Sequence, residues 1–224
     1  MAQIFHPSFN TISRVSVFGA IFFLAAGAWA WDRLLRSSYT TQVNVARGQP
    51  VPFSHKHHVA GLGIDCRYCH TTVEQGAFAG MPPTKTCMGC HSLVWQDAPM
   101  LAPVRKSYQE DRPIEWTRVH DLPDFAYFDH SIHIDRGIGC STCHGRVDQM
   151  PLMWRTETLN MDWCLDCHRD PVANVRPKDR IYDMEFEPDS LPRSVREELA
   201  HEYGINKLMA NGINVLTNCS VCHR

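Results

Sequence analysis

The feature that most constrains this chain is a five-residue pattern, C-x-x-C-H, which occurs five times. The 224 residues include 10 cysteines, and every one of them falls in this pattern. The cysteines are Cys66, Cys69, Cys87, Cys90, Cys140, Cys143, Cys164, Cys167, Cys219 and Cys222. The histidines that follow each pair are His70, His91, His144, His168 and His223. No cysteine is left for any other purpose.

Closely spaced cysteines can bind zinc, form disulfides or act as a redox dithiol. None of these chemistries requires a histidine directly after every pair. Attachment of a c-type haem does, because the two thiols bond to the porphyrin and the next side chain reaches the iron. The sequence therefore predicts a cytochrome with five covalently bound haems c. Such thiols are handled outside the cytoplasm, so we expect an extracytoplasmic haem domain.

The N-terminal region contains a long apolar run, "VSVFGAIFFLAAGAWAW" at residues 15–31. With Ile12 and Ser13 it approaches the roughly 20 residues that cross a hydrocarbon core. Trp29 and Trp31 stand where an interfacial aromatic belt would lie. A cleaved signal peptide is the alternative, since "AWA" resembles a cleavage site, but the run exceeds the usual apolar core of about 7–15 residues.

We therefore expect an uncleaved signal anchor that crosses the bacterial cytoplasmic membrane once. Residues 12–31 would form its helix, with residues 1–11 in the cytoplasm and the haem domain on the periplasmic side. The basic residues on the two sides of the run do not set this topology clearly, so the orientation rests on the haem motifs.

The rest of the chain contains an internal repeat. "FSHKHHVAGLGIDCRYCHTTVEQ" at 53–75 matches "FDHSIHIDRGIGCSTCHGRVDQ" at 128–149. Each copy continues to a second C-x-x-C-H motif, so the sequence predicts two duplicated two-haem modules. The expected segments are a stalk at 32–52, a first module at 53–91, a connector at 92–127, a second module at 128–170, and a C-terminal segment at 171–224 that holds the fifth haem.

Regular secondary structure should be sparse in this region. Proline interrupts most candidate helices. The best candidate is 190–210, where Ser190 could cap a helix and Pro192 stands early in it. We expect a fold that is mostly coil, with short helices packed around five haems that supply much of the apolar core.

A six-coordinate haem also needs a distal ligand, usually histidine or methionine. Each module begins with an H-x-x-H segment, formed by His55 and His58 in the first and by His130 and His133 in the second. Two histidines at this spacing can reach in different directions and so serve two neighbouring haems. His57 has no counterpart in the second module, and we expect it to be exposed.

One distal ligand remains to be assigned. His120, in "EWTRVHDLPDF", is the first choice for the fifth haem, and His201 or a methionine stays open. The candidate methionines are Met150, Met153, Met161 and Met209. Methionine more often packs in a core than binds iron, but a thioether ligand would raise the haem potential.

The apolar run, the duplicated modules, "RVHDLPDFAYFDHSIH" and "MDWCLDCHRDP" together resemble the pentahaem cytochrome c subunit of alternative complex III. Related cytochromes occur in the menaquinone reductase complexes of sulfate reducers. The resemblance covers residues 12–224. It implies a subunit of a membrane complex that oxidises quinol and passes electrons to a periplasmic cytochrome, a cupredoxin or an oxidase. The implied partners are an iron–sulfur subunit related to molybdopterin enzymes, integral membrane quinol-binding subunits and a monohaem cytochrome c.

The modules also resemble short multihaem cytochromes of the c3 and c7 type, in which the first histidine of an H-x-x-H segment serves the haem of the motif that follows. That resemblance implies four ligand pairs. They are His55 with His70, His58 with His91, His130 with His144, and His133 with His168.

Other functional classes fit less well. A net charge of −2 gives no basic stripe for nucleic acid, and the sequence carries no nucleophile motif or phosphate loop. Irons with both axial positions filled transfer electrons and bind no substrate, so we expect no catalytic residue. Two alternatives remain: a membrane-anchored quinol dehydrogenase that acts alone, and a multihaem oxyanion reductase with one open iron. The fifth haem, remote from the other motifs in sequence, is expected at one end of the electron path.

Overall fold

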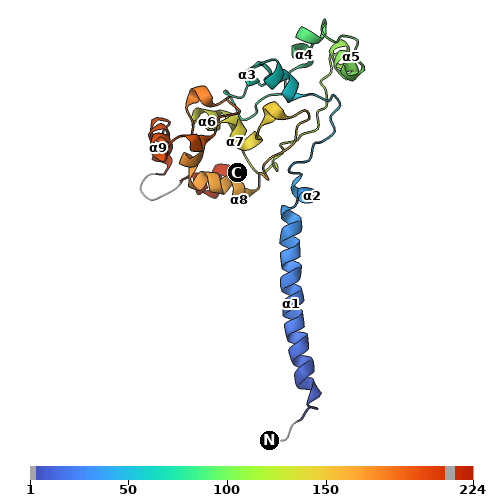
Figure 1. Cartoon of the computed structure of the whole chain (residues 1–224), viewed down its shortest axis with the longest axis vertical. Helices are drawn as coiled ribbons and strands as arrows, with labels where there is room; N and C mark the ends of the chain where they lie inside the picture. Colours follow the sequence, from blue (N-terminus) through green and yellow to red (C-terminus); the bar gives the residue numbers. More distant parts are fainter. Residues whose placement is uncertain (1–3, 210–214, 224) are drawn as a thin grey trace. The chain divides into compact units, whose positions relative to one another are not determined.

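The computed structural model describes residues 4–209 and 215–223 (Figure 1). This part of the chain is mostly coil with short helices and one long helix, and it contains no β-strand, although Ile138 and Val175 form an isolated antiparallel bridge. The fold divides into two compact units, and the boundary falls between Val43 and Asn44. The expected architecture of short helices joined by coil is therefore present.

The N-terminal unit consists of helix α1, Ser8–Arg36, and one further turn, α2, Ser38–Thr41. Among the described residues, this is the one helical stretch that is long and apolar enough to cross a membrane, and a signal sequence would meet the same criteria. Its apolar side chains are exposed around the whole circumference, as expected for a lipid-facing helix. The helix is longer at both ends than the expected 12–31, since polar residues such as Asp32, which pairs with Arg36 at 2.9 Å, continue it.

The second unit is built from short helices. Those carrying or preceding the motifs of the first module are η1 (Lys56–Gly61), α3 (Cys66–Cys69) and α4 (Thr84–His91). The connector contributes η2 (Pro99–Leu101) and α5 (Ala102–Glu110). The second module contains α6 (His130–Asp135), α7 (Cys140–His144), η3 (Val147–Gln149) and α8 (Met161–Arg169). The C-terminal segment contains η4 (Pro171–Asn174), η5 (Lys178–Arg180), η6 (Pro188–Ser190), α9 (Arg193–Glu202), α10 (Ile205–Leu208), η8 (Val215–Thr217) and α11 (Cys219–Cys222).

Local capping explains where several of these helices begin. Asp65 precedes α3 and accepts a hydrogen bond from the backbone N–H of Arg67 at 2.8 Å. Asn218 precedes α11 and accepts from the N–H of Ser220 at 3.2 Å. Such side chains satisfy N–H groups that a helix start leaves without partners. The cap therefore sets each helix to begin at the first cysteine of its motif.

The helix expected at 190–210 is present in two pieces, α9 and α10. It begins after Pro192, and Ser190 lies in the preceding turn η6 instead of capping it. Gly204 separates the pieces with φ of +73°, a left-handed conformation that glycine adopts without strain. The sequence pattern found the helix, and its interruption follows from this glycine.

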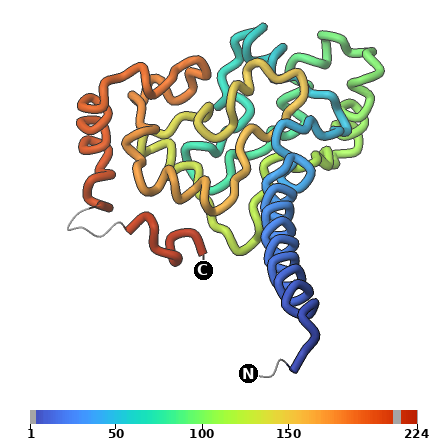
Figure 2. Tube along the Cα trace, turned by 60° about the horizontal axis from the view of Figure 1, so that its bottom comes forward, coloured from blue at the N-terminus to red at the C-terminus, as the bar shows by residue number. Residues whose placement is uncertain are grey.

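Protein side chains form two small apolar clusters in the second unit. The larger joins the second module to the C-terminal segment and consists of Ile138, Val172, Val175, Ala200, Tyr203 and Ile205. The smaller lies around α4 and α5 and consists of Val51, Leu101 and Val104. Segments of the two modules lie side by side in the second unit (Figure 2), where the backbone N–H of Lys56 donates to the carbonyl of Met150 at 3.0 Å.

Candidate haem sites

The cysteines have the geometry of neither a disulfide framework nor a zinc site. All ten are free thiols. Within residues 4–209 and 215–223, no three His, Cys, Asp or Glu side chains converge as the ligands of a metal ion would. A structural zinc site needs four such ligands arranged as a tetrahedron. The five cysteine pairs, each followed by a histidine, are consistent with attachment of multiple haems c.

Most of the candidate ligand histidines are held by the same hydrogen bond. In each, Nδ1 donates to a backbone carbonyl, so Nε2 is the nitrogen that would bind iron. The motif histidines held in this way are His70 by Gly80 (2.7 Å), His91 by Val94 (3.0 Å), His168 by Leu216 (2.9 Å) and His223 by Phe125 (3.0 Å). The others are His58 by Ser54 (2.9 Å), His130 by Ala77 (2.6 Å) and His133 by Asp129 (2.7 Å).

Three pairs of histidine rings lie at nearly the same spacing, although the rings of His58 and His91 are inclined at 66° and those of the other two pairs are nearly parallel. The ring centroids are 6.2 Å apart for His58 and His91, 6.2 Å for His133 and His168, and 6.3 Å for His130 and His144. Metal–imidazole bonds are about 2 Å long, so two rings on opposite sides of one iron have centroids about 6 Å apart. The three spacings therefore match those of bis-histidine iron sites.

The phenylalanine at the start of each module orients its H-x-x-H segment. Phe53 stacks on His58 with centroids 4.4 Å apart, and Phe128 stacks on His133 at 4.5 Å. The same two phenylalanines meet the first histidines edge-on, at 4.9 Å and 4.8 Å. The repeat in the sequence contains these phenylalanines, but the sequence did not reveal that they lie between the two histidines.

His55 lies in a buried setting beside the first motif. Burial lowers its pKa to about 4, and the charge of His70 lowers it further in the same direction. Its Nδ1 atom is buried without a hydrogen-bond partner. A neutral imidazole is the form that binds a metal. The lowered pKa fits a ligand role for this side chain, whereas its Nδ1 lacks the carbonyl acceptor that holds most of the other candidate histidines.

His120 lies beside the third motif. Its ring centroid is 4.3 Å from that of His144, which is too close for an iron between them. Its Nε2 atom is buried without a partner, and burial lowers its pKa to about 4. The ring that faces His223 belongs to Phe125, with centroids 5.8 Å apart. His120 was expected to serve the fifth haem, and the structure brings it instead to His144, whose pKa burial lowers to about 3.

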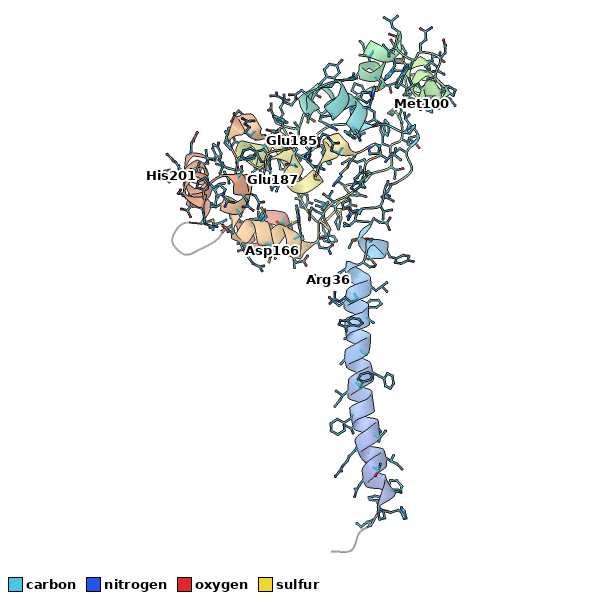
Figure 3. All side chains as sticks on the ribbon, viewed as in Figure 1. Arg36, Met100, Asp166, Glu185, Glu187 and His201 are labelled. Atoms are coloured by element: carbon cyan, nitrogen blue, oxygen red, sulfur yellow. The ribbon has the colours of Figure 1, made fainter. Side chains whose placement is uncertain are left out.

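The other candidates for the remaining ligand are placed as follows. Met150 is almost fully buried and Met161 is exposed. Met209 packs against the larger apolar cluster. His201 lies on the exposed outer side of α9 (Figure 3). His57 is exposed, as expected, and stacks on Trp95 with centroids 5.4 Å apart.

Comparison with known proteins gives one informative match. No protein-family model matches the sequence. The chain is 35% identical over 128 residues to the multihaem cytochrome c subunit of the menaquinone reductase of Nitratidesulfovibrio vulgaris. The match spans 56% of this chain and 56% of that protein, so the chain covers little more than half of its relative. With its five motifs, this chain is thus a homologue of a multihaem cytochrome c.

Proposed function

We propose that this chain carries electrons through five haems c as a subunit of a membrane-bound, quinone-linked complex. The observation that carries the proposal is the set of three histidine pairs at 6.2–6.3 Å, each of which includes the histidine of a C-x-x-C-H motif. The same spacing recurs in both modules, which a chance contact between core histidines would not produce.

The residues have distinct roles in this proposal. The ten cysteines hold the porphyrins, and the motif histidines bind the irons on one side. His55, His58, His130 and His133 bind four of these irons on the other side. The haem supplies reversible one-electron chemistry, with a potential set by its ligands and its burial. The backbone carbonyls that accept from Nδ1 fix the rings, and an iron with a histidine on each side has no position left for a substrate.

The direction proposed is quinol oxidation, in a complex of the alternative complex III type. The N-terminal helix would remain attached as a single-pass anchor in the bacterial cytoplasmic membrane, with the haem unit in the periplasm. Its partners would be the iron–sulfur subunit related to molybdopterin enzymes, the integral membrane subunits and the monohaem cytochrome c. Electrons would leave to a periplasmic cytochrome, a cupredoxin or an oxidase.

In a second candidate function, electrons flow in the opposite direction. The relative belongs to a menaquinone reductase, so electrons could enter this chain from a periplasmic donor and pass towards menaquinone. The two directions separate in the purified complex. Quinol oxidation predicts that added menaquinol reduces the haems, whereas quinone reduction predicts that dithionite-reduced haems are reoxidised by added menaquinone much faster than menaquinol reduces them.

The number and ligation of the haems are tested on the intact chain. We expect the mass of the denatured protein to exceed that of the polypeptide by five haems, and electron paramagnetic resonance to show low-spin iron throughout. A high-spin signal that shifts with added nitrite or sulfite would instead support the oxyanion reductase. Quinol oxidation by this chain without partners would support the dehydrogenase that acts alone. A mature N-terminus near Trp31 would contradict the anchor.

A further inference from the structure

The two modules are joined by a pair of equivalent backbone hydrogen bonds, one donated by each module to the other. The backbone N–H of Lys56 donates to the carbonyl of Met150 at 3.0 Å. The N–H of Ser131 donates to the carbonyl of Gly76 at 3.2 Å. Lys56 and Ser131 each follow the first histidine of an H-x-x-H segment, and Met150 and Gly76 each follow the glutamine that ends the repeat. Reciprocal contacts between equivalent positions are the mark of two-fold symmetry.

The equivalent motifs meet at this pseudo-two-fold axis. The backbone N–H of Cys140 in the third motif donates to the carbonyl of Ile181 at 3.2 Å. The ring of the next residue, Tyr182, lies 4.5 Å from the guanidinium of Arg67 in the first motif. His130, whose ring centroid is 6.3 Å from that of His144, donates to the carbonyl of Ala77 in the first module at 2.6 Å. The first and third haem sites are therefore neighbours.

The second and fourth sites lie outward from this central pair. A Cβ on Gly89 of the second motif would lie 3.9 Å from the hydroxyl oxygen of Tyr68 in the first motif. Asn174 donates to Sγ of Cys167 in the fourth motif at 3.6 Å, and Arg176, two residues later, donates to the hydroxyl of Ser141 in the third motif at 3.1 Å. In Figure 1, α4 accordingly lies beyond α3, and α8 lies on the other side of α7.

The fifth site extends the row on one side only. His168 of the fourth motif donates from Nδ1 to the carbonyl of Leu216, just before the fifth motif, at 2.9 Å. The N–H of Tyr127, at the start of the second module, donates to the carbonyl of Cys222 at 2.8 Å. Both contacts attach the fifth motif to the second module.

We infer that the two modules are related by a pseudo-two-fold axis between the first and third haem sites, and that the five haems form one unbranched row in the order second, first, third, fourth, fifth. The inference rests on the proposed function for its haems, and on backbone and ring geometry for their order. The motif of the second haem, and not that of the first, forms the end of the row opposite the fifth.

Both ends of this row lie next to exposed apolar side chains. Leu93, just after the second motif, is 84% exposed, and Trp95 beside His91 is 55% exposed. Phe125, which faces the fifth motif histidine, is 65% exposed. Electrons would therefore enter the row at one of these sites and leave at the other, while the first, third and fourth haems act as internal relays.

The reciprocal contact is tested by photo-crosslinking in the full-length holo protein. A photoreactive phenylalanine analogue replaces Lys56, and the crosslinked peptide is identified by mass spectrometry. We expect a link to the peptide that contains Met150. The matched control places the analogue at His57, which should link to the peptide that contains Trp95. A Lys56 product confined to the first module would overturn the two-fold arrangement.

The order itself is tested by the iron positions in a structure of the holo protein. We expect the first and third irons to be nearest neighbours and the fifth iron to have the fourth as its one close neighbour. A branched arrangement, or a fifth iron flanked by two others, would overturn the order while leaving five bound haems and the proposed function intact. Fewer than five haems would instead overturn the proposed function.

Discussion

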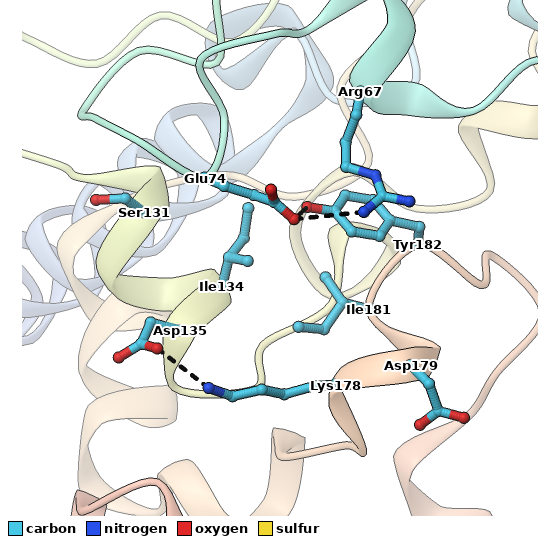
Figure 4. Close-up of a pocket in the computed structure, with 9 residues that line it drawn as sticks. All are labelled: Arg67, Glu74, Ser131, Ile134, Asp135, Lys178, Asp179, Ile181 and Tyr182. Atoms are coloured by element: carbon cyan, nitrogen blue, oxygen red, sulfur yellow. Dashed lines mark hydrogen bonds and ion pairs between the residues drawn. The ribbon is translucent and has the colours of Figure 1, made fainter.

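The first and third motifs are equivalent in the repeat, but their surroundings differ. The third motif, C-S-T-C-H, packs on Arg176, which is 1% exposed. The Arg176 guanidinium donates to the hydroxyls of Ser141 and Thr142, both at 3.1 Å. The first motif, C-R-Y-C-H, instead directs Arg67 outward, over the ring of Tyr182 (Figure 4). One motif therefore rests on a buried cation, and the other presents a cation to solvent.

The difference shows which features of a site are local and which are tertiary. In both modules a phenylalanine stacks on the second histidine of the H-x-x-H segment. In both, the ring centroid of that histidine also lies 6.2 Å from that of the histidine in the module's second C-x-x-C-H motif. These contacts lie within each repeat. The burial of the third motif comes from the C-terminal segment, which packs on one module only. Equivalent ligands can therefore have different potentials, because burial and nearby charge tune a haem.

The largest effects should follow removal of an H-x-x-H ligand. His58→Ala and His133→Ala should each convert one haem iron of five from low spin to high spin or to a new ligand set, because one axial bond is lost. Visible and electron paramagnetic resonance spectra measure this change. His57→Ala is the matched control and should leave the spectra unchanged. A low-spin spectrum that is unaltered in either ligand variant would remove the proposed equivalence of the modules.

The next largest effect concerns the buried arginine. Arg176→Met should lower the free energy of unfolding by about 3 kcal/mol, since two hydroxyls and the carbonyl of Asp183 lose a charged donor. Arg67→Met, at a half-exposed side chain, should cost less than about 1 kcal/mol. Chemical unfolding of the holo protein, followed by haem absorbance, compares the two. Equal losses would show that Arg176 stabilises the protein no more than Arg67 does, contrary to the difference in their burial.

A smaller effect is expected at the residue before each motif. Gly139 lies against Arg176, and a Cβ there would collide with the guanidinium. Gly139→Ala should therefore cost about 1–3 kcal/mol through overpacking. The equivalent change in the first motif, Asp65→Ala, removes a helix cap and should cost about 1 kcal/mol. Combining Gly139→Ala with Arg176→Met should recover part of the loss, and additive losses would contradict the collision.

The smallest effect should come from the surface contact of the first motif. Tyr182 donates from its hydroxyl to Glu74 at 2.7 Å in an exposed setting. Tyr182→Phe removes that bond but keeps the ring under Arg67, so stability should fall by about 0.5–1 kcal/mol. The haem spectra should stay unchanged. A change in the first haem's spectrum would mean that this outer contact positions the motif after all.

Local sequence patterns were enough to predict much of this molecule. The C-x-x-C-H motifs, the two H-x-x-H segments and the helix near residues 193–202 depend on residues close together in the chain, so their spacing predicts them. The position of His120 beside His144 and the burial of Arg176 under the third motif could not be predicted in this way. Both depend on contacts between segments far apart in the chain, which form only when the modules and the C-terminal segment pack together. Local sequence periodicity does not reveal such contacts.

The hydrogen bond between Lys56 and Met150 has a consequence for the order in which the molecule is made. Met150 lies almost a hundred positions after Lys56, so a chain that emerges N-terminus first exposes its first module well before the partner exists. At ~5–20 residues per second, synthesis of that stretch takes about 5–20 s. The first two motifs can receive their haems during this interval, while their H-x-x-H segment is still unsupported. Maturation and folding would then be coupled, with the N-terminal haem sites closing only after the second module has emerged.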